Sequence, residues 1–178
     1  MKRLFVALTI PDSVSKKLVA LQPESVKQIR LVKPMNIHLT LHFIGQADLD
    51  KTANVLEQVS VQQFTIKLKE PGLFRSKNGS ITFWVGVQEN EKLLELYHEI
   101  AFALAEVGYQ KEERKFSPHI TLARCKKGVS RPIIDKFLQQ KGSAFSALQI
   151  TDFGLYSSNL TNAGPVYKLE HVYSLNLS

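Results

Sequence analysis

The feature that most constrains this 178-residue chain is an order of segments that occurs twice and ends each time in the same short motif. The hydrophobic pattern predicts a strand, a helix and a second strand between Leu4 and Ile44, and the same order between Ile81 and Ala123. Each final strand carries the pattern His-x-Thr. This repetition predicts an internal duplication that builds two similar lobes. The motif residues are His38 with Thr40, and His119 with Thr121.

Alternating and helical hydrophobic patterns assign most of the remaining chain. Strands are predicted at Leu4–Ile10, Ile37–Ile44, Phe64–Lys69, Ile81–Val87, His119–Ala123, Ala147–Ser157 and Val166–Leu175. Helices are predicted at Ser13–Leu21, Glu24–Ile29, Asp48–Val59, Glu91–Val107 and Arg131–Gln140. The expected fold is α+β: one bilobal domain over residues 1–178, in which duplicated strand–helix–strand units with pseudo-twofold symmetry form antiparallel sheets that face a central cleft.

Composition favours a soluble globular protein, with 44% hydrophobic and 22% charged residues. The net charge of +7 is compatible with a polyanionic partner such as nucleic acid, but does not require one. The single cysteine, Cys125, excludes an intrachain disulfide and fits a reducing compartment. The apolar run after Lys2-Arg3 is too short for a signal peptide and ends at Pro11-Asp12, so we expect a first strand there and a cytoplasmic protein.

The two motifs suit acid–base chemistry on a phosphate ester. Side chains at positions i and i+2 of a strand share one face and stand about 6.5–7 Å apart, so each His/Thr pair can bracket one phosphate group. Because the ordinary imidazole pKa is about 6.5, one ring can be neutral and the other charged near neutral pH. The threonine hydroxyls can donate hydrogen bonds to the non-bridging oxygens. Two such pairs therefore predict a catalytic centre built on His38 and His119.

Two residues near the motifs have competing interpretations. Strict alternation places His42 on the face of His38 but about 13 Å away, so we expect it at the periphery of the site. Alternation also turns Arg124 away from His119. A bulge would redirect Arg124 toward the phosphate, and a surface salt bridge is the alternative.

The sequence lacks the common metal and nucleotide-binding motifs. It contains neither a His-Glu-x-x-His nor a Cys-x-x-Cys pattern, and no glycine-rich loop of the Walker or dinucleotide-binding type. We therefore expect an activity that needs no metal and no organic cofactor.

Nearly the full length of the chain resembles the two-histidine (2H) phosphoesterase superfamily, and within it the LigT-like RNA 2′,3′-cyclic phosphodiesterases of the 2′-5′ RNA ligase family. The resemblance rests on five segments in order. They are Arg3-Leu-Phe-Val-Ala-Leu, Asn36-Ile-His-Leu-Thr-Leu-His-Phe-Ile-Gly45, Phe83-Trp-Val-Gly-Val, Ser117-Pro-His-Ile-Thr-Leu-Ala-Arg124, and Leu155-Tyr-Ser-Ser followed by Gly164-Pro-Val-Tyr167.

This resemblance implies hydrolysis of a 2′,3′-cyclic phosphate on a nucleotide or RNA end, giving a 2′-phosphate without a metal. It also implies, for some members, reversible joining of 2′–5′ linkages in tRNA halves. The implied partner is RNA or a nucleotide with a cyclic phosphate end, tRNA fragments included. We expect a monomer that does not bind membranes.

The resemblance also assigns roles to residues of this chain. His38 matches the general acid for the O3′ leaving group, and His119 matches the base that activates water. The pseudo-symmetric motifs themselves give no physical reason to choose between the two roles. Phe43 matches a position that lies near the nucleobase, although alternation places its ring in the core. The residues that match phosphate-holding positions are Thr40, Thr121 and Arg124.

This chain departs from the family pattern at two positions, and two other functions are also compatible with the sequence. Leu31 stands where many relatives carry Trp, and His42 stands where Arg or Lys is frequent. Either difference would change base or RNA preference rather than the chemistry. The net charge of +7 also fits a protein that binds RNA ends and catalyses only incidentally. A phosphodiesterase acting on another small cyclic phosphate is the third possibility.

Overall fold

The computed structural model describes residues 1–110, 115–126, 128–140, 147–162 and 164–177. The helices are α1 (Asp12–Ala20), a 3-10 turn η1 (Pro34–Asn36), α2 (Leu49–Leu56), α3 (Glu91–Ala105) and α4 (Arg131–Leu138). The strands are β1 (Lys2–Thr9), β2 (Ile29–Leu31), β3 (His38–Ala47), β4 (Phe64–Ile66), β5 (Leu68–Arg75), β6 (Ile81–Val87), β7 (His119–Cys125), β8 (Leu148–Ile150), β9 (Asp152–Thr161) and β10 (Gly164–Ser174). No helix within these described ranges is long and apolar enough to cross a membrane.

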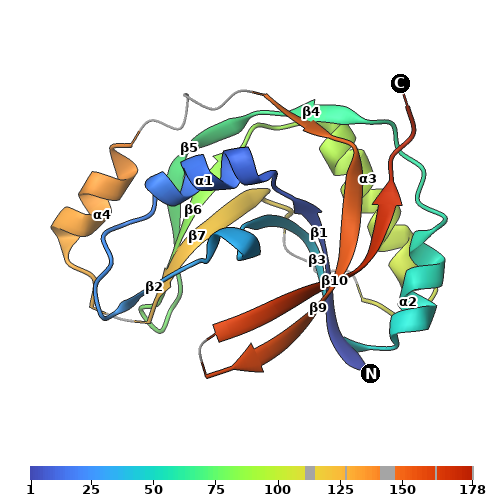
Figure 1. Cartoon of the computed structure of the whole chain (residues 1–178), viewed down its shortest axis with the longest axis horizontal. Coiled ribbons are helices and arrows are strands. Elements are labelled where there is room, and N and C mark those ends of the chain that lie inside the picture. Colours follow the sequence, from blue (N-terminus) through green and yellow to red (C-terminus); the bar gives the residue numbers. More distant parts are fainter. Residues whose placement is uncertain (111–114, 127, 141–146, 163, 178) are drawn as a thin grey trace.

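One large antiparallel sheet carries most of the strands. Its order is β10-β9-β1-β3-β7-β6-β5, with β2 paired to β7 beside this path, and β4 and β8 form a separate pair (Figure 1). The α+β class, the antiparallel pairing and the duplicated units are therefore confirmed. The expected lobes are two wings of one sheet, because β3 and β7 lie side by side at its centre.

The seam between the two wings is narrow. Only one Cα pair, Leu39 with Ile120, is in register between β3 and β7 among the described residues. On either side of it stand the matching units β1-α1-β3 and β6-α3-β7. The two final strands of the duplication thus meet at their motif residues.

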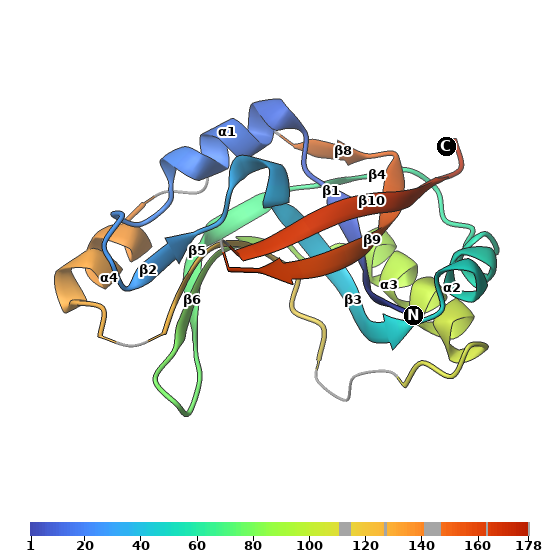
Figure 2. The ribbon, with the colours of Figure 1, turned by 60° about the horizontal axis from the view of Figure 1, so that its bottom comes forward.

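The two units exchange their helices. Figure 1 shows α1 and α4 on the wing of β5, β6 and β7, and α2 and α3 on the wing of β1, β9 and β10. Gln22, just after α1, donates side-chain hydrogen bonds to the carbonyls of Val32 and Leu122, and Leu122 belongs to β7. Figure 2 shows the same division from below. Because each first helix covers the strands of the other unit, the two halves interlock.

Local sequence signals account for the helix starts. Asp48, the N-cap of α2, accepts a hydrogen bond from the Lys51 amide at 2.9 Å. Asn90 does the same for the Leu93 amide at 2.8 Å at the start of α3. On α4, Phe137 packs edge-on against Phe83 of β6, with ring centroids 5.1 Å apart.

The helix predicted at Glu24–Ile29 is wrong. The segment leads instead into β2, in which Ile29 pairs with Cys125 and Arg30 pairs with Arg124 of β7. A turn closed by the hydrogen bond from the Ile29 amide to the Val26 carbonyl, at 2.9 Å, precedes the strand. Pairing with an existing sheet edge outweighs the weak helical tendency of six residues after a proline.

Candidate active site

The two His-x-Thr motifs lie on one face of the sheet. Leu39 and Ile120 are paired and fully buried beneath β3 and β7. Because strand side chains alternate, the motif residues on either side of them point to the opposite face. All four are partly exposed there: His38, Thr40, His119 and Thr121. The structure therefore brings together the four residues that the repeated motif predicts.

Each histidine is held in the same way by backbone two residues earlier. His38 Nδ1 lies 2.7 Å from the carbonyl oxygen of Asn36, and His119 Nδ1 lies 2.8 Å from that of Ser117. A carbonyl can only accept, so Nδ1 carries the proton and donates it in both rings. Nε2 is consequently the nitrogen that each neutral ring presents for proton transfer.

The electrostatic surroundings favour the neutral form of both rings. Burial lowers the pKa of His38, the hydrogen bond to Asn36 opposes that shift, and the nearby positive charges of Arg124 and His119 lower it further. Burial likewise lowers the pKa of His119, the hydrogen bond to Ser117 opposes it, and Arg124 adds to the lowering. A single guanidinium therefore acts on both histidines. An anion bound between them would reverse part of this effect.

A β-bulge explains how Arg124 reaches the site. In the pairing of β6 with β7, Phe83 lies opposite Ala123 and Trp84 lies opposite Thr121, so Leu122 is the extra residue. The extra residue reverses the alternation that follows it, which returns Arg124 to the face of His119 and Thr121. The expectation from strict alternation is wrong here, and the bulge interpretation is confirmed. Arg124 Nη1 donates to Thr82 Oγ1 at 3.3 Å.

The other motif is followed by the same irregularity. Between β1 and β3, Val6 lies opposite His42 and Ala7 lies opposite Thr40, so Leu41 is the extra residue. Phe43 consequently leaves the core position that alternation assigned to it and is 55% exposed, with its ring 6.2 Å from that of Phe5. The exposed ring lies on the face of the histidines, and its contact with a nucleobase stays a prediction.

The expected position of His42 is also wrong. Its side chain is 2% exposed on the face opposite His38, stacked on Tyr97 with ring centroids 4.2 Å apart. Its Nε2 lies 2.8 Å from the Tyr97 carbonyl oxygen of α3. His42 is therefore a structural residue that fastens α3 to β3. Leu31, the other departure from the family pattern, lies in β2 opposite Ala123 and packs on the core.

Aromatic rings surround both histidines, and none of these rings is among the site residues predicted from the sequence. Around His38 lie Phe5 at 5.2 Å and Tyr167 at 5.2 Å between ring centroids. Around His119 lie Phe74 at 4.8 Å and Trp84 at 6.2 Å. Phe5, Trp84 and Tyr167 belong to the segments that carry the family resemblance, so the sequence did contain a signal for their place at the site. Phe74 lies outside those segments, and nothing in the sequence marks it.

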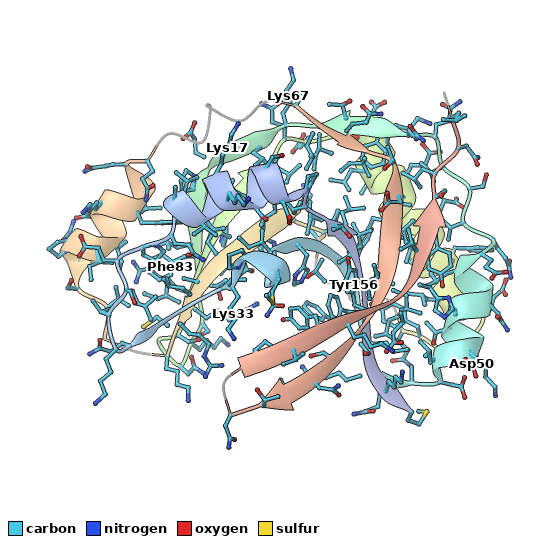
Figure 3. All side chains as sticks on the ribbon, in the orientation of Figure 1. Lys17, Lys33, Asp50, Lys67, Phe83 and Tyr156 are labelled. Atoms are coloured by element: carbon cyan, nitrogen blue, oxygen red, sulfur yellow. The ribbon has the colours of Figure 1, made fainter. Side chains whose placement is uncertain are left out.

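The wall beside His38 is tied to the next strands of the sheet. Tyr156 of β9 stacks on Phe5 with ring centroids 5.2 Å apart, and its hydroxyl lies 2.5 Å from Thr9 Oγ1. Figure 3 shows Tyr156 among the side chains beside β9 and β1. Burial raises the pKa of the Tyr167 hydroxyl, against the lowering effect of Arg124 and Arg3. Tyr167 thus faces the same cationic group as the two histidines.

The described part of the chain contains no cluster of three or more His, Cys, Asp or Glu side chains that could hold a metal ion. The groups that surround the motifs are instead imidazoles, hydroxyls, the Arg124 guanidinium and aromatic rings. This set can exchange protons and bind an anion.

Comparison with known proteins gives a consistent result over most of the chain. The family model of the 2′-5′ RNA ligase superfamily matches residues 10–162. An RNA 2′,3′-cyclic phosphodiesterase of Methanocaldococcus jannaschii is 33% identical over 170 residues, which cover 94% of this chain and 97% of that protein. One of Thermotoga maritima is 30% identical over 175 residues, covering 94% and 92%.

Solved structures share the fold. A protein of Thermus thermophilus matches with a TM-score of 0.80 at 25% identity over 97% of both chains. The LigT protein of E. coli, in a complex with 3′-AMP, matches with a TM-score of 0.78 at 21% identity over 98% of both chains. With the duplicated sheet and the paired motifs at its seam, the chain belongs to the 2′-5′ RNA ligase superfamily.

Proposed function

We propose that this protein is an RNA 2′,3′-cyclic phosphodiesterase, which hydrolyses the cyclic phosphate of an RNA end or a nucleotide to a 2′-phosphate without a metal. One observation carries the proposal. His38 and His119 stand on the same face of adjacent strands, each with Nδ1 fixed by a carbonyl and Nε2 left for proton transfer. Relatives of the chain at 30–33% identity are named RNA 2′,3′-cyclic phosphodiesterases.

The proposed reaction uses the two rings in opposite protonation states. Neutral His119 takes a proton from water through Nε2 while the water oxygen bonds to phosphorus. The bond between phosphorus and O3′ breaks, and protonated His38 gives its Nε2 proton to O3′. The product is a 2′-phosphate with a free 3′-hydroxyl. The family resemblance supplies this direction, and exchange of one proton between the two rings and solvent restores the starting state.

Three further side chains have proposed roles around the phosphate. The hydroxyls of Thr40 and Thr121 donate hydrogen bonds to the non-bridging oxygens, where negative charge increases in the transition state. Arg124 neutralises the same charge, and its electrostatic effect on both histidines supports a position between them. Phe43, exposed on this face, offers its ring to the nucleobase.

Substrate binding also explains how His38 can act as the general acid although its pKa is lowered in the free protein. Before substrate binds, both rings favour the neutral form, which suits the base His119 but not the acid His38. The cyclic phosphate carries one negative charge, and an adjacent anion favours the imidazolium. The substrate therefore supplies the condition under which His38 holds its proton.

The decisive experiment is incubation of the purified protein with adenosine 2′,3′-cyclic phosphate in excess EDTA, with the 2′- and 3′-phosphate products separated. Turnover to the 2′-phosphate that is lost in His119→Ala supports the proposal. His171→Ala is the matched control and should keep full activity, because His171 is an exposed histidine of β10. Abolition by EDTA, or full activity in His119→Ala, would contradict it.

The family description favours a second, related reaction. If the 5′-hydroxyl of another RNA replaces water, the same acid and base join the two ends through a 2′–5′ linkage. We propose that this joining is the minor reaction, since water competes in an open site. Incubation of two matched tRNA halves, followed by mapping of the new linkage, tests it. A single-domain, monomeric, cytoplasmic protein stays a prediction, and sedimentation analysis and cell fractionation would check it.

A further inference from the structure

A cavity of about 810 Å³ lies between β2, β6 and the end of β7 and has no role in the chemistry above. Arg124 and Thr82 form part of its wall, and β2 and the end of β7 provide the rest. This volume lies in the range of sites that hold a small molecule or a nucleotide. Because Arg124 shares the face of His119 and Thr121 on β7 and also lines the cavity, the cavity adjoins the proposed reaction centre.

The lining of the cavity is strongly cationic. Four basic residues contribute to it, and the described residues that line it include no carboxylate. None of the four has an ion pair to a carboxylate in the described part of the chain. A cavity of this kind stabilises an anion rather than a neutral or cationic ligand. The four residues are Lys27, Arg30, Arg124 and Lys126.

Two of these cations are direct neighbours across strands. Arg30 of β2 lies opposite Arg124 of β7, and Arg124 lies opposite Thr82 of β6, so the three side chains form a row on one face. Like charges directly opposite each other on a sheet destabilise it. A bound anion between the two guanidiniums would relieve this repulsion.

Arg30 is the member of this row that lies nearest the hairpin of β9 and β10. A Cβ added to Gly164, at the start of β10, would lie 3.9 Å from Arg30 Nη1. The guanidinium therefore stands between the cavity and the strand that supplies Tyr167. Arg30 thus connects the cavity to the start of β10, three residues before Tyr167.

The strand geometry gives the order of groups along β7. On β7, His119, Thr121 and the redirected Arg124 share one face. Lys126 follows the end of the strand at Cys125 and lines the cavity together with Arg124. The path leads from the phosphate that reacts to the cations of the cavity. An RNA that ends in a 2′,3′-cyclic phosphate carries its other phosphates on the 5′ side of the terminal nucleoside.

We propose that this cavity binds the RNA phosphodiester on the 5′ side of the terminal nucleoside, with Arg30, Lys27 and Lys126 as its ligands. The inference rests on the proposed phosphodiesterase function and names its substrate more closely. An oligonucleotide end is then a better substrate than a mononucleotide, which does not reach these cations.

The test compares two substrates in three proteins. The substrates are adenosine 2′,3′-cyclic phosphate and an adenosine trinucleotide that ends in the same cyclic phosphate. The proteins are the wild type, the double variant Arg30→Gln with Lys126→Gln, and Lys67→Gln. Lys67 is exposed, and Figure 3 shows it at the edge of the molecule near β4 and β5, away from β2.

We expect the double variant to raise KM for the trinucleotide about tenfold and to leave the mononucleotide kinetics within about twofold of wild type. Lys67→Gln should match wild type on both substrates. The trinucleotide KM of the wild type should also rise more steeply with salt than that of the double variant, because fewer phosphate contacts remain in the variant. Equal loss on both substrates, or no loss on either, overturns the proposal.

A binding measurement separates this inference from the proposed function. Fluorescence anisotropy with a labelled adenosine trinucleotide that ends in a 2′-phosphate reports the subsite without turnover. Absence of hydrolysis in the wild type, together with weaker binding by the double variant, would reject the function and keep the subsite. Hydrolysis of both substrates with unchanged trinucleotide binding would keep the function and reject the subsite. Thermal denaturation of all three proteins checks that the double variant is folded.

Discussion

Phe43 and Arg124 occupy equivalent positions in the two halves of the molecule, five residues after His38 and His119 respectively. A one-residue bulge precedes each of them, at Leu41 and at Leu122, and turns each side chain to the face of the histidines. The duplication therefore places an aromatic ring on one side of the reaction centre and a guanidinium on the other. Symmetric strands thus present an asymmetric surface to the substrate.

Removal of either histidine should nearly abolish hydrolysis. We expect kcat to fall by roughly 10²–10⁴-fold in His38→Ala and in His119→Ala, because each change removes one proton-transfer step. The double variant should be little worse than the more damaged single variant, because the two groups act as a unit. Steady-state kinetics with His98→Ala, an exposed histidine on α3, as the control would check this. Additive losses would contradict a joint role.

The rate should show a bell-shaped pH profile with its maximum below pH 6.5. Burial and Arg124 lower the pKa of both histidines from 6.5, so kcat/KM falls on the acid side as the base gains a proton and on the alkaline side as the acid loses one. Arg124→Gln should move both limbs to higher pH, because the charge that lowers both pKa values is gone. Arg124→Lys keeps the charge, so its profile should stay near that of wild type even where its rate is lower. Identical profiles in all three proteins would contradict the assigned electrostatic effect.

Phe43→Ala should impair substrate binding and leave stability nearly unchanged. The ring is 55% exposed, so its removal costs little core packing. Loss of a base–aromatic stack costs about 1–3 kcal/mol, which corresponds to a rise in KM of at least about fivefold. Phe43→Trp should retain low KM values. Phe102→Ala, on an exposed ring of α3, provides the matched control, and an unchanged KM in Phe43→Ala would remove this residue from the site.

Gly72→Ala should destabilise the wall beside His119. A Cβ at Gly72 would lie 2.1 Å from a ring carbon of Trp84, so the indole must move. Overpacking of this kind costs about 1–3 kcal/mol in the free energy of unfolding. Urea denaturation measures that loss, and Trp84→Leu in the Gly72→Ala background should recover part of it. A destabilisation that Trp84→Leu does not relieve would show that the strain lies elsewhere.

Glu170 should contribute to stability above pH 4.5 and lose that contribution in acid. Hydrogen bonds from Ser157 and Lys2, and then from Lys168, lower the pKa of the Glu170 carboxyl from 4.5 to about 2. Because the folded-state pKa is lower than the unfolded one, the stabilisation is complete above pH 4.5 and disappears as the pH falls toward about 2. Glu170→Gln should cost about 1 kcal/mol at neutral pH and little near pH 2, with the exposed Glu89→Gln as control. A loss that does not vary with pH would contradict the ionic origin.

The sequence predicts which face of the sheet each motif side chain lies on, and it does so correctly as far as Thr40 and Thr121, where the two His-x-Thr motifs end. Alternation places His38, Thr40, His119 and Thr121 correctly, because hydrophobic periodicity reports the face of a regular strand. It fails at the next residue in both halves, and for the same reason. A bulge is defined by the pairing of two strands, so a single strand carries no signal for it. His42, Phe43 and Arg124 therefore needed the structure.

The remaining surprises come from contacts between distant segments. Tyr167 and Phe74 reach the histidines from β10 and β5, which are far from the motifs in the chain. Arg30 was hidden in a short segment whose strand exists only because β7 offers an edge to pair with. Three residues have too little periodicity to indicate a strand.

The narrow seam gives the buried layer a direct influence on reactivity. The two strands that carry His38 and His119, the proposed acid and base, meet through the single register pair Leu39 and Ile120, and both of these residues are completely enclosed. Backbone pairing fixes the spacing of the strands at this one point, and the two aliphatic side chains anchor the pair in the core beneath it. A substitution that loosened this packing would change how firmly the two imidazoles are held relative to each other without touching a polar atom, so the turnover number would respond to a change in the interior.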